Sequence, residues 1–120
     1  MKKHPMPRDV VLDVHEREKG LCAVCGLPVG REAGHLHHRQ PRGMGGGSGK
    51  AHALSNIVLL HATCHLTHVE LKRANAYQNG WLVQHWKTPS ETPFRYMLNR
   101  TVLLNDDGTI TDIGERTSAR

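Results

Sequence analysis

The segment LLHATCHLTH, residues 59–68, places four metal-ligating side chains within eight positions: His61, Cys64, His65 and His68. Upstream, the stretch CAVC puts two cysteines at residues 22 and 25. A Cys-x2-Cys turn offers two thiolates from one loop, and His61-x2-Cys64 repeats that spacing. Together the two half-sites predict a structural zinc site of the Cys3His type, formed by Cys22, Cys25, His61 and Cys64.

The cysteine count agrees with this prediction. The chain has three cysteines, so a disulfide framework would leave one unpaired, and a reducing cytosol disfavours disulfides. The alternative is that the three are separate buried thiols. If they bind zinc, the metal joins the two ends of the strand–loop–strand segment that lies between the half-sites.

Further histidines predict a second metal centre. On a helix, His65 points about 100° away from Cys64, so it does not easily share the zinc. The stretch HLHHR, residues 35–39, is a predicted strand on which His37 and His38 face opposite ways. One of them can then bind a metal while the other acts on a water. His68, at i+3 from His65, is expected on the same helix face as a third ligand or a hydrogen-bond donor.

Charge patterning favours an anionic partner. The formal net charge is +5, and no Asp or Glu occurs from Ala33 to Val69. The same window holds Arg39, Arg42 and Lys50, together with seven of the ten histidines. Such a window is a plausible contact surface for phosphate, the alternative being an ordinary solvated surface. Two of its histidines, His35 and His52, are expected to be surface residues.

The elements that must position these residues are mixed. We expect helices at 8–19 and 62–76, strands at 35–39, 55–60 and 80–86, and a hairpin at Asp107-Gly108. The glycine-rich stretch 41–52 is expected to be a mobile loop, and the C-terminal tail disordered. No apolar run is long enough for a membrane span, and MKKHPMPRD lacks the apolar stretch of a signal peptide. We therefore expect a cytoplasmic α+β protein.

The stretch LHHRQPRGMGG followed by LSNIVLLHATCH resembles the HNH endonuclease family, over roughly residues 20–70. The resemblance implies a ββα-metal core with a structural zinc knuckle, in the zinc-stapled branch of the family. Four cysteines are usual in that branch, so His61 is a departure. The stretches HHRQPRGMGG and NGWLV further resemble small HNH proteins encoded by phages.

Several site roles follow from this resemblance. It makes His38 the general base and Asn56 the residue that fixes the loop and orients His38. It makes His37 and His65, with His68 as a candidate third, the ligands of a catalytic divalent ion such as Mg²⁺, Mn²⁺, Ni²⁺ or Zn²⁺. DNA contacts are expected from the cationic residues of the acid-free window: Arg39, Arg42 and Lys50.

The resulting hypothesis is a metal-dependent DNA endonuclease, with phage DNA packaging or processing as its setting and terminase subunits as partners. Residues 1–78 would form the nuclease core with its N-terminal helix and zinc knuckle, and residues 79–120 a β-rich extension of the same domain. The alternative is a zinc module that binds nucleic acid without cutting it.

Overall fold

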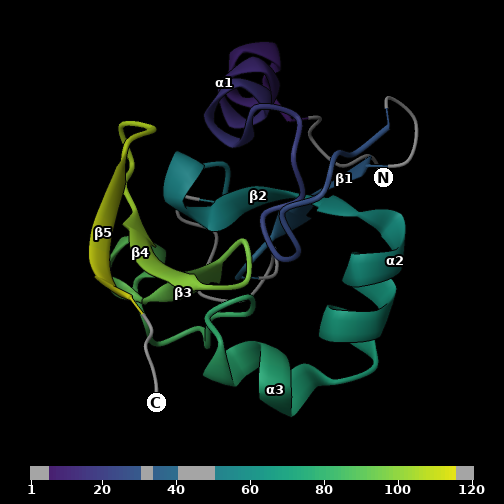
Figure 1. The fold of residues 1–120 in the computed structure, drawn as a ribbon. Coiled ribbons are helices and arrows are strands. Elements are labelled where there is room, and N and C mark those ends of the chain that lie inside the picture. The colour runs from purple at the N-terminus through teal and green to yellow at the C-terminus, as the bar shows by residue number, and fades with distance from the viewer. Residues whose placement is uncertain (1–5, 31–33, 41–50, 116–120) are drawn as a thin grey trace, which may run out of the picture.

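The computed structural model describes residues 6–30, 34–40 and 51–115 (Figure 1). Most of the expected glycine-rich loop and the end of the expected disordered tail lie outside these residues. The described chain is an α+β structure, in which a two-stranded hairpin and a three-stranded sheet accompany three α-helices. Among the described residues, no helix has both the length and the apolar character needed to cross a bilayer.

The hairpin is the central element. Its strands β1, Gly34–His38, and β2, Ile57–His61, pair antiparallel, with His37 opposite Val58. A 3₁₀ turn, Leu54–Asn56, precedes β2. All four residues of the run IVLL are buried because both faces of β2 are covered.

One face of the hairpin packs against the N-terminal helix. This helix, α1, Arg8–Glu18, ends as expected before Gly20, with Lys19 and Gly20 both at positive φ. Its Val14 forms a small apolar cluster with Ile57 and Leu59 of β2. In Figure 1, α1 lies above the hairpin, with α2 on one side and the three-stranded sheet on the other.

The helix predicted over 62–76 is interrupted. α2, Ala62–Cys64, continues as a π-helical segment, His65–Glu70, and a separate helix, α3, spans Arg73–Gln78. The break falls at Lys72, whose backbone is outside the helical region with φ −135° and ψ 60°. The wider π turns bury Val69 and leave Leu66 and Leu71 exposed, so the apolar pattern of this stretch is not that of one continuous helix.

The C-terminal residues form a three-stranded antiparallel sheet: β3, Phe94–Tyr96; β4, Arg100–Leu104; and β5, Ile110–Glu115. The turn predicted at Asp107-Gly108 is confirmed, with Gly108 at φ +90°. The strand predicted at 80–86 is wrong. Trp81, Leu82 and Val83 are buried, but their N–H groups bond to the carbonyls of Ala76 and Arg39, not to a neighbouring strand.

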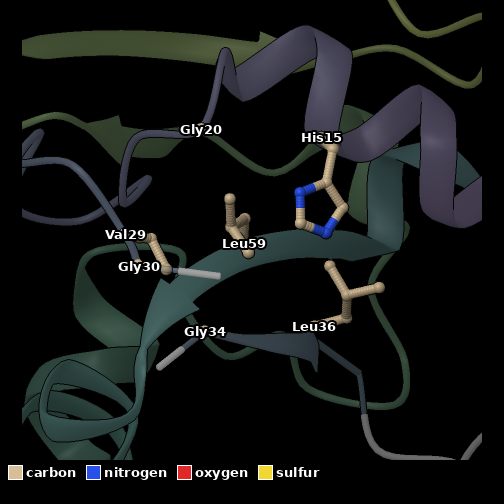
Figure 2. Close-up of a pocket in the computed structure, with 7 residues that line it drawn as sticks. All are labelled: His15, Gly20, Val29, Gly30, Gly34, Leu36 and Leu59. Carbon is tan, nitrogen blue, oxygen red and sulfur yellow. The ribbon is translucent and has the colours of Figure 1, made fainter. Parts of the chain in front are cut away.

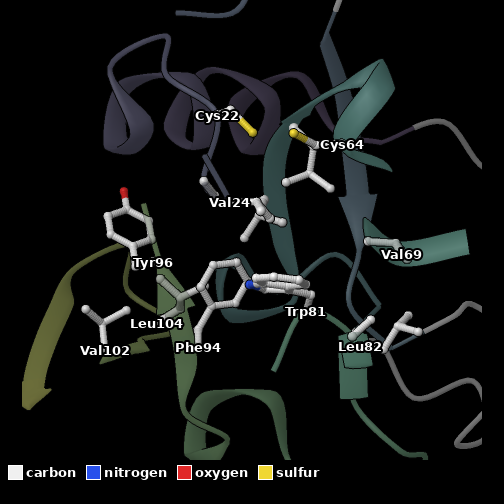
Figure 3. Packing of buried hydrophobic residues seen from close by; sticks show 14 residues of the cluster. Cys22, Val24, Cys64, Val69, Trp81, Leu82, Phe94, Tyr96, Val102 and Leu104 are labelled. Carbon is white, nitrogen blue, oxygen red and sulfur yellow. The ribbon is translucent and has the colours of Figure 1, made fainter. Parts of the chain in front are cut away.

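A single large core joins the hairpin to this C-terminal region. Side chains from the cysteine turn, from β2 and the helix after it, and from the C-terminal sheet pack together (Figure 3). The labelled members in that view are Cys22, Val24, Cys64, Val69, Trp81, Leu82, Phe94, Tyr96, Val102 and Leu104. The C-terminal region therefore shares one hydrophobic core with the cysteine turn and the hairpin.

A buried polar network ties α1 to both sheets. Glu18 is fully buried, and its carboxylate accepts hydrogen bonds from Arg17 and, at 2.9 Å, from the Tyr96 hydroxyl. Arg17 also donates to the carbonyls of Leu54 and Ile57, at 2.7 and 2.6 Å. Burial, together with the Glu18 carboxylate, raises the pKa of Tyr96 above its usual value, so the hydroxyl stays a donor.

We predict that Tyr96→Phe lowers the free energy of unfolding by about 1–3 kcal/mol, because it leaves a buried carboxylate without one of its donors. Urea unfolding of the zinc-loaded protein measures the change. The control is Asp112→Asn, which disrupts the exposed ion pair with Arg100 and should lower the free energy of unfolding by less than Tyr96→Phe does. Equal losses from the two substitutions would contradict the importance assigned to the buried network.

Candidate metal centre and active site

The two half-sites predicted from sequence converge. The ligand atoms of Cys22, Cys25, His61 and Cys64 all lie within 4.8 Å of one another. The cysteine turn is closed by a hydrogen bond from Gly26 N to Cys22 O, at 2.8 Å, and Gly26 adopts φ +78°. A second hydrogen bond joins Cys25 N to Cys22 Sγ, at 3.5 Å. Because His61 ends β2 and Cys64 ends α2, the cluster connects the cysteine turn to the hairpin.

The orientation of His61 suits a metal ligand. Its Nδ1 lies 3.3 Å from Cys25 Sγ and 3.9 Å from Cys64 Sγ. Its Nε2 lies 2.8 Å from the carbonyl oxygen of Pro28, which can only accept, so Nε2 carries the hydrogen. Nδ1 then keeps its lone pair toward the sulfurs. A carbonyl partner on the far nitrogen is the usual outer contact of a zinc-bound imidazole. The donor set therefore fits zinc.

The protonation of the cluster depends on a cation. Burial, with Cys22 beside it, raises the pKa of the Cys64 thiol to about 12 in the metal-free protein. Thiolates are the form that binds zinc, so binding must release protons and becomes weaker in acid.

A second cluster is made of imidazoles. His35 and His37 alternate along β1 and so share a face, and both adjoin His65. His35 Nδ1 lies 3.1 Å from His65 Nδ1, and the rings of His37 and His65 are 4.9 Å apart between centroids. Among the described residues, only the Cys3His group already has its ligand atoms close enough together to hold a metal. The imidazole cluster needs a ring rotation to converge on one ion.

Burial lowers the pKa of both His37 and His65 and so favours the neutral form, which is the form that metals bind. His37 is 5% exposed, and its Nε2 donates to the Trp81 carbonyl at 2.8 Å. Burial lowers the pKa of His37 to about 4, so it is uncharged at neutral pH. Burial also lowers the pKa of His65, whose Nε2 is 3.7 Å from the Glu70 carboxylate.

His68 does not join this cluster. The expectation that it reaches the face of His65 assumed α-helical geometry, whereas His65–Glu70 is π-helical. In a π-helix the backbone hydrogen bonds join residues five apart, not four. The residue that lies next to His65 is therefore Glu70, not His68. The His68 ring instead lies edge-on to Trp81, at 5.9 Å between centroids.

The other face of β1 carries a separate imidazole pair. His38 Nε2 lies 3.4 Å from His52 Nδ1. Nearby, the buried Asn56 accepts from Gln40 N at 2.7 Å and donates to the carbonyls of Gln40 and Ala51, at 3.3 and 2.9 Å. Gln40 and Ala51 flank residues 41–50, so one side chain holds both sides of that stretch. This geometry agrees with the loop-fixing role that the resemblance implies for Asn56.

Arg39 is placed differently from the expectation. Its side chain is fully buried and donates to four backbone carbonyls at 2.7–3.0 Å: Gly80, Ser55, Pro89 and Thr92. Its guanidinium also lies over the Phe94 ring. Arg39 therefore joins the hairpin to the C-terminal region and is not a phosphate contact. Arg42 and Lys50 lie outside the described residues.

Two residues near the site were expected to be ordinary surface residues. His35 had a detectable signal, since it alternates with His37 on a predicted strand. His52 had no such signal, because its contact with His38 joins residues 14 positions apart that no shared pattern connects. A groove of about 400 Å³ lies between α1 and the hairpin (Figure 2). Among the described residues that line it, His15 is the one with a titratable side chain, and it faces Leu36 and Leu59. The groove adds no further group to the imidazole clusters.

One of the comparisons with known proteins finds a match, and it covers the segment that carries these residues. Residues 22–69 match the family model described as HNH endonuclease. This segment contains the Cys3His group, both imidazole clusters and Asn56. No curated protein and no solved structure matches the chain.

We predict that one zinc per chain survives dialysis and that a strong chelator then unfolds the protein, because structural zinc contributes about 10–16 kcal/mol in small modules. Metal analysis and circular dichroism measure the two effects. Cys25→Ser should abolish zinc retention, whereas His85→Ser, at an exposed histidine outside the cluster, should not. A native spectrum after complete metal removal would contradict the predicted role of zinc.

Proposed function

Because residues 22–69 belong to the HNH endonuclease family, we propose that the protein is a metal-dependent DNA endonuclease that hydrolyses phosphodiester bonds. One observation carries the proposal. Two consecutive histidines at the end of β1 meet different imidazoles: His37 adjoins His65, and His38 adjoins His52. Such an arrangement separates a metal-binding group from a proton-accepting group while keeping the two close.

In this proposal His38 is the general base. It takes a proton from the attacking water, a role suited to imidazole because its ordinary pKa is near 6.5. The neighbouring Nδ1 of His52, 3.4 Å from His38 Nε2, can share that proton. Asn56 positions His38 indirectly, because it holds Gln40, two residues further along the chain, to Ala51.

The proposed cation ligands are His37 and His65, with His35 in place of His68. A divalent cation held there supplies positive charge to stabilise the phosphate oxygens as negative charge develops on them. Glu70, at 3.7 Å from His65 Nε2, orients that ring so that Nδ1 faces His35. An all-imidazole set favours Zn²⁺, Ni²⁺ or Mn²⁺ over Mg²⁺.

A second candidate function is a zinc module that binds nucleic acid without cutting it. It is favoured by the finding that the Cys3His group alone, among the described residues, already converges on a metal position. On the resemblance alone, we also propose a setting in phage DNA packaging beside terminase subunits, and phosphate contacts by Arg42 and Lys50.

We predict that the zinc-loaded protein nicks supercoiled plasmid when Mn²⁺, Ni²⁺ or Mg²⁺ is added. His38→Ala should lower the rate about 10²–10⁴-fold, because it removes the base while the fold stays intact. His15→Ala, at an exposed histidine of α1, is the matched control and should cut at the wild-type rate. Equal cutting by His38→Ala would refute the base assignment. Binding of DNA without cutting, whichever metal is supplied, would favour the second function.

We predict that the zinc-loaded protein binds one further Mn²⁺, measured by calorimetry and by the loss of the free-ion signal in electron paramagnetic resonance. His65→Ala should abolish this binding, and His35→Ala should weaken it about tenfold or more, because each removes an imidazole from the site. His68→Ala should leave the affinity unchanged, since that ring packs against Trp81. A stronger effect from His68→Ala than from His35→Ala would reverse our choice of ligand.

A further inference from the structure

A tryptophan stands out on the surface beside the active-site strand. After the buried run 81–83, the chain emerges at Gln84, and Trp86 is 69% exposed, with its ring edge-on to His85 at 5.1 Å between centroids. Trp86 therefore presents a large aromatic ring to solvent, of the kind on which a nucleobase can stack.

The segment that carries Trp86 is fixed to the active site. Gln40 donates through Nε2 to the carbonyls of Gln84 and Lys87, both at 2.9 Å. The backbone N–H of the same Gln40 donates to Asn56. Val83 N also bonds to the Arg39 carbonyl, at 2.9 Å. Trp86 is therefore held close to the stretch that Asn56 organises.

A polar recess begins at Lys87, the residue that follows this tryptophan. It has a volume of about 150 Å³ and lies between the segment after Trp86 and the residues before β2. Its polar lining includes Gln40, Ser55, Lys87, Thr88, Ser90 and Asp106. Ser55 donates its hydroxyl to the Asp106 carboxylate at 2.5 Å. The recess thus combines an exposed lysine, hydroxyl groups and one carboxylate acceptor.

This combination fits a nucleobase better than a phosphate. A carboxylate repels phosphate, but it accepts hydrogen bonds from the exocyclic amino group of a base. Stacking of a base on an aromatic side chain contributes about 1–3 kcal/mol, and an adjacent lysine can neutralise the backbone phosphate. A base paired within a duplex is stacked on both faces, so it cannot occupy such a site without leaving the helix.

We propose that Trp86 and the adjoining recess form a binding site for one unpaired nucleobase of the DNA substrate, with Lys87 contacting its backbone phosphate. The inference rests on the proposed nucleic-acid function and extends it to the C-terminal region, beyond residues 22–69. Two observations favour a nucleic-acid strand over a second copy of the chain as the occupant. Gln40 connects the Trp86 segment to the candidate active site, and Lys87 is cationic. The base stacks on Trp86, and its edge meets the hydroxyl and carboxylate groups of the recess.

The test uses the fluorescence of the two tryptophans, since Trp81 is buried and Trp86 is exposed. A single-stranded 12-mer is titrated into zinc-loaded His38→Ala protein, which should bind without cutting. We expect quenching of the emission in the parent protein. In this background Trp86→Ala should weaken binding about tenfold or more, measured by the anisotropy of a dye-labelled 12-mer, which does not depend on tryptophan emission. Trp86→Phe should retain most of the affinity, because the ring still stacks.

Leu98→Ala, at an aliphatic residue that is 60% exposed in the turn between β3 and β4, is the control and should bind like its parent. Zinc content and circular dichroism establish that each variant is folded. Unchanged affinity in Trp86→Ala would overturn the inference, as would equally strong quenching by a fully paired duplex. The inference would also be overturned if the parent protein is a dimer and Trp86→Ala makes it a monomer. The occupant would then be a second copy of the chain.

Failure of this inference can be separated from failure of the proposed nuclease function. Plasmid nicking by the wild-type protein reports on the nuclease, whereas quenching is measured in a background that lacks the base. Quenching without nicking supports the nucleobase site and counts against catalysis. Nicking without any effect of Trp86→Ala on oligonucleotide affinity counts against the nucleobase site alone.

Discussion

The fold depends on the meeting of three sulfurs and one imidazole at the point where the cysteine turn touches the end of the hairpin. Cys22 and Cys25 come from a turn near the N-terminus, and His61 and Cys64 come from the end of β2 and from α2. A cation bound at this point would tie the two ends of the hairpin unit together, next to the start of the helix after β2. That helix carries His65, so the position of the imidazole cluster follows from the sulfur cluster.

The C-terminal region buries and orients side chains of β1, the strand of the candidate active site. Trp81 accepts the hydrogen bond that orients His37, and Gly80, Pro89 and Thr92 accept three of the hydrogen bonds from the buried Arg39. Tyr96 joins the C-terminal sheet to α1, because its hydroxyl donates a hydrogen bond to Glu18. Residues outside the matched family segment therefore bury and orient residues within it. The same region presents Trp86, so one extension serves both the stability of the site and the proposed contact with substrate.

Local patterns in the sequence predicted much of this arrangement. The Cys-x2-Cys and His-x2-Cys spacings, the α1 boundaries and the Asp107-Gly108 turn each depend on nearby residues, and the structure confirms the sulfur cluster and the turn. Predictions that needed distant contacts fared worse. The π-helical turn that separates His68 from His65 has no signature in the residue types. The apolar run at 81–83 is buried without pairing to a strand. Arg39 is buried because four backbone carbonyls from distant segments accept its hydrogen bonds, and a single cationic residue in the sequence gives no sign of such partners.

Zinc K-edge X-ray absorption on protein dialysed to one zinc per chain identifies the atoms that bind the retained metal. We expect three sulfurs at about 2.3 Å and one nitrogen at about 2.0 Å. We further expect that His61→Cys converts these ligands to four sulfurs, whereas His65→Ala leaves them unchanged. A first shell of nitrogen and oxygen alone, or one altered by His65→Ala, would contradict the separation of a sulfur-rich structural site from the imidazole cluster on which the proposed function depends.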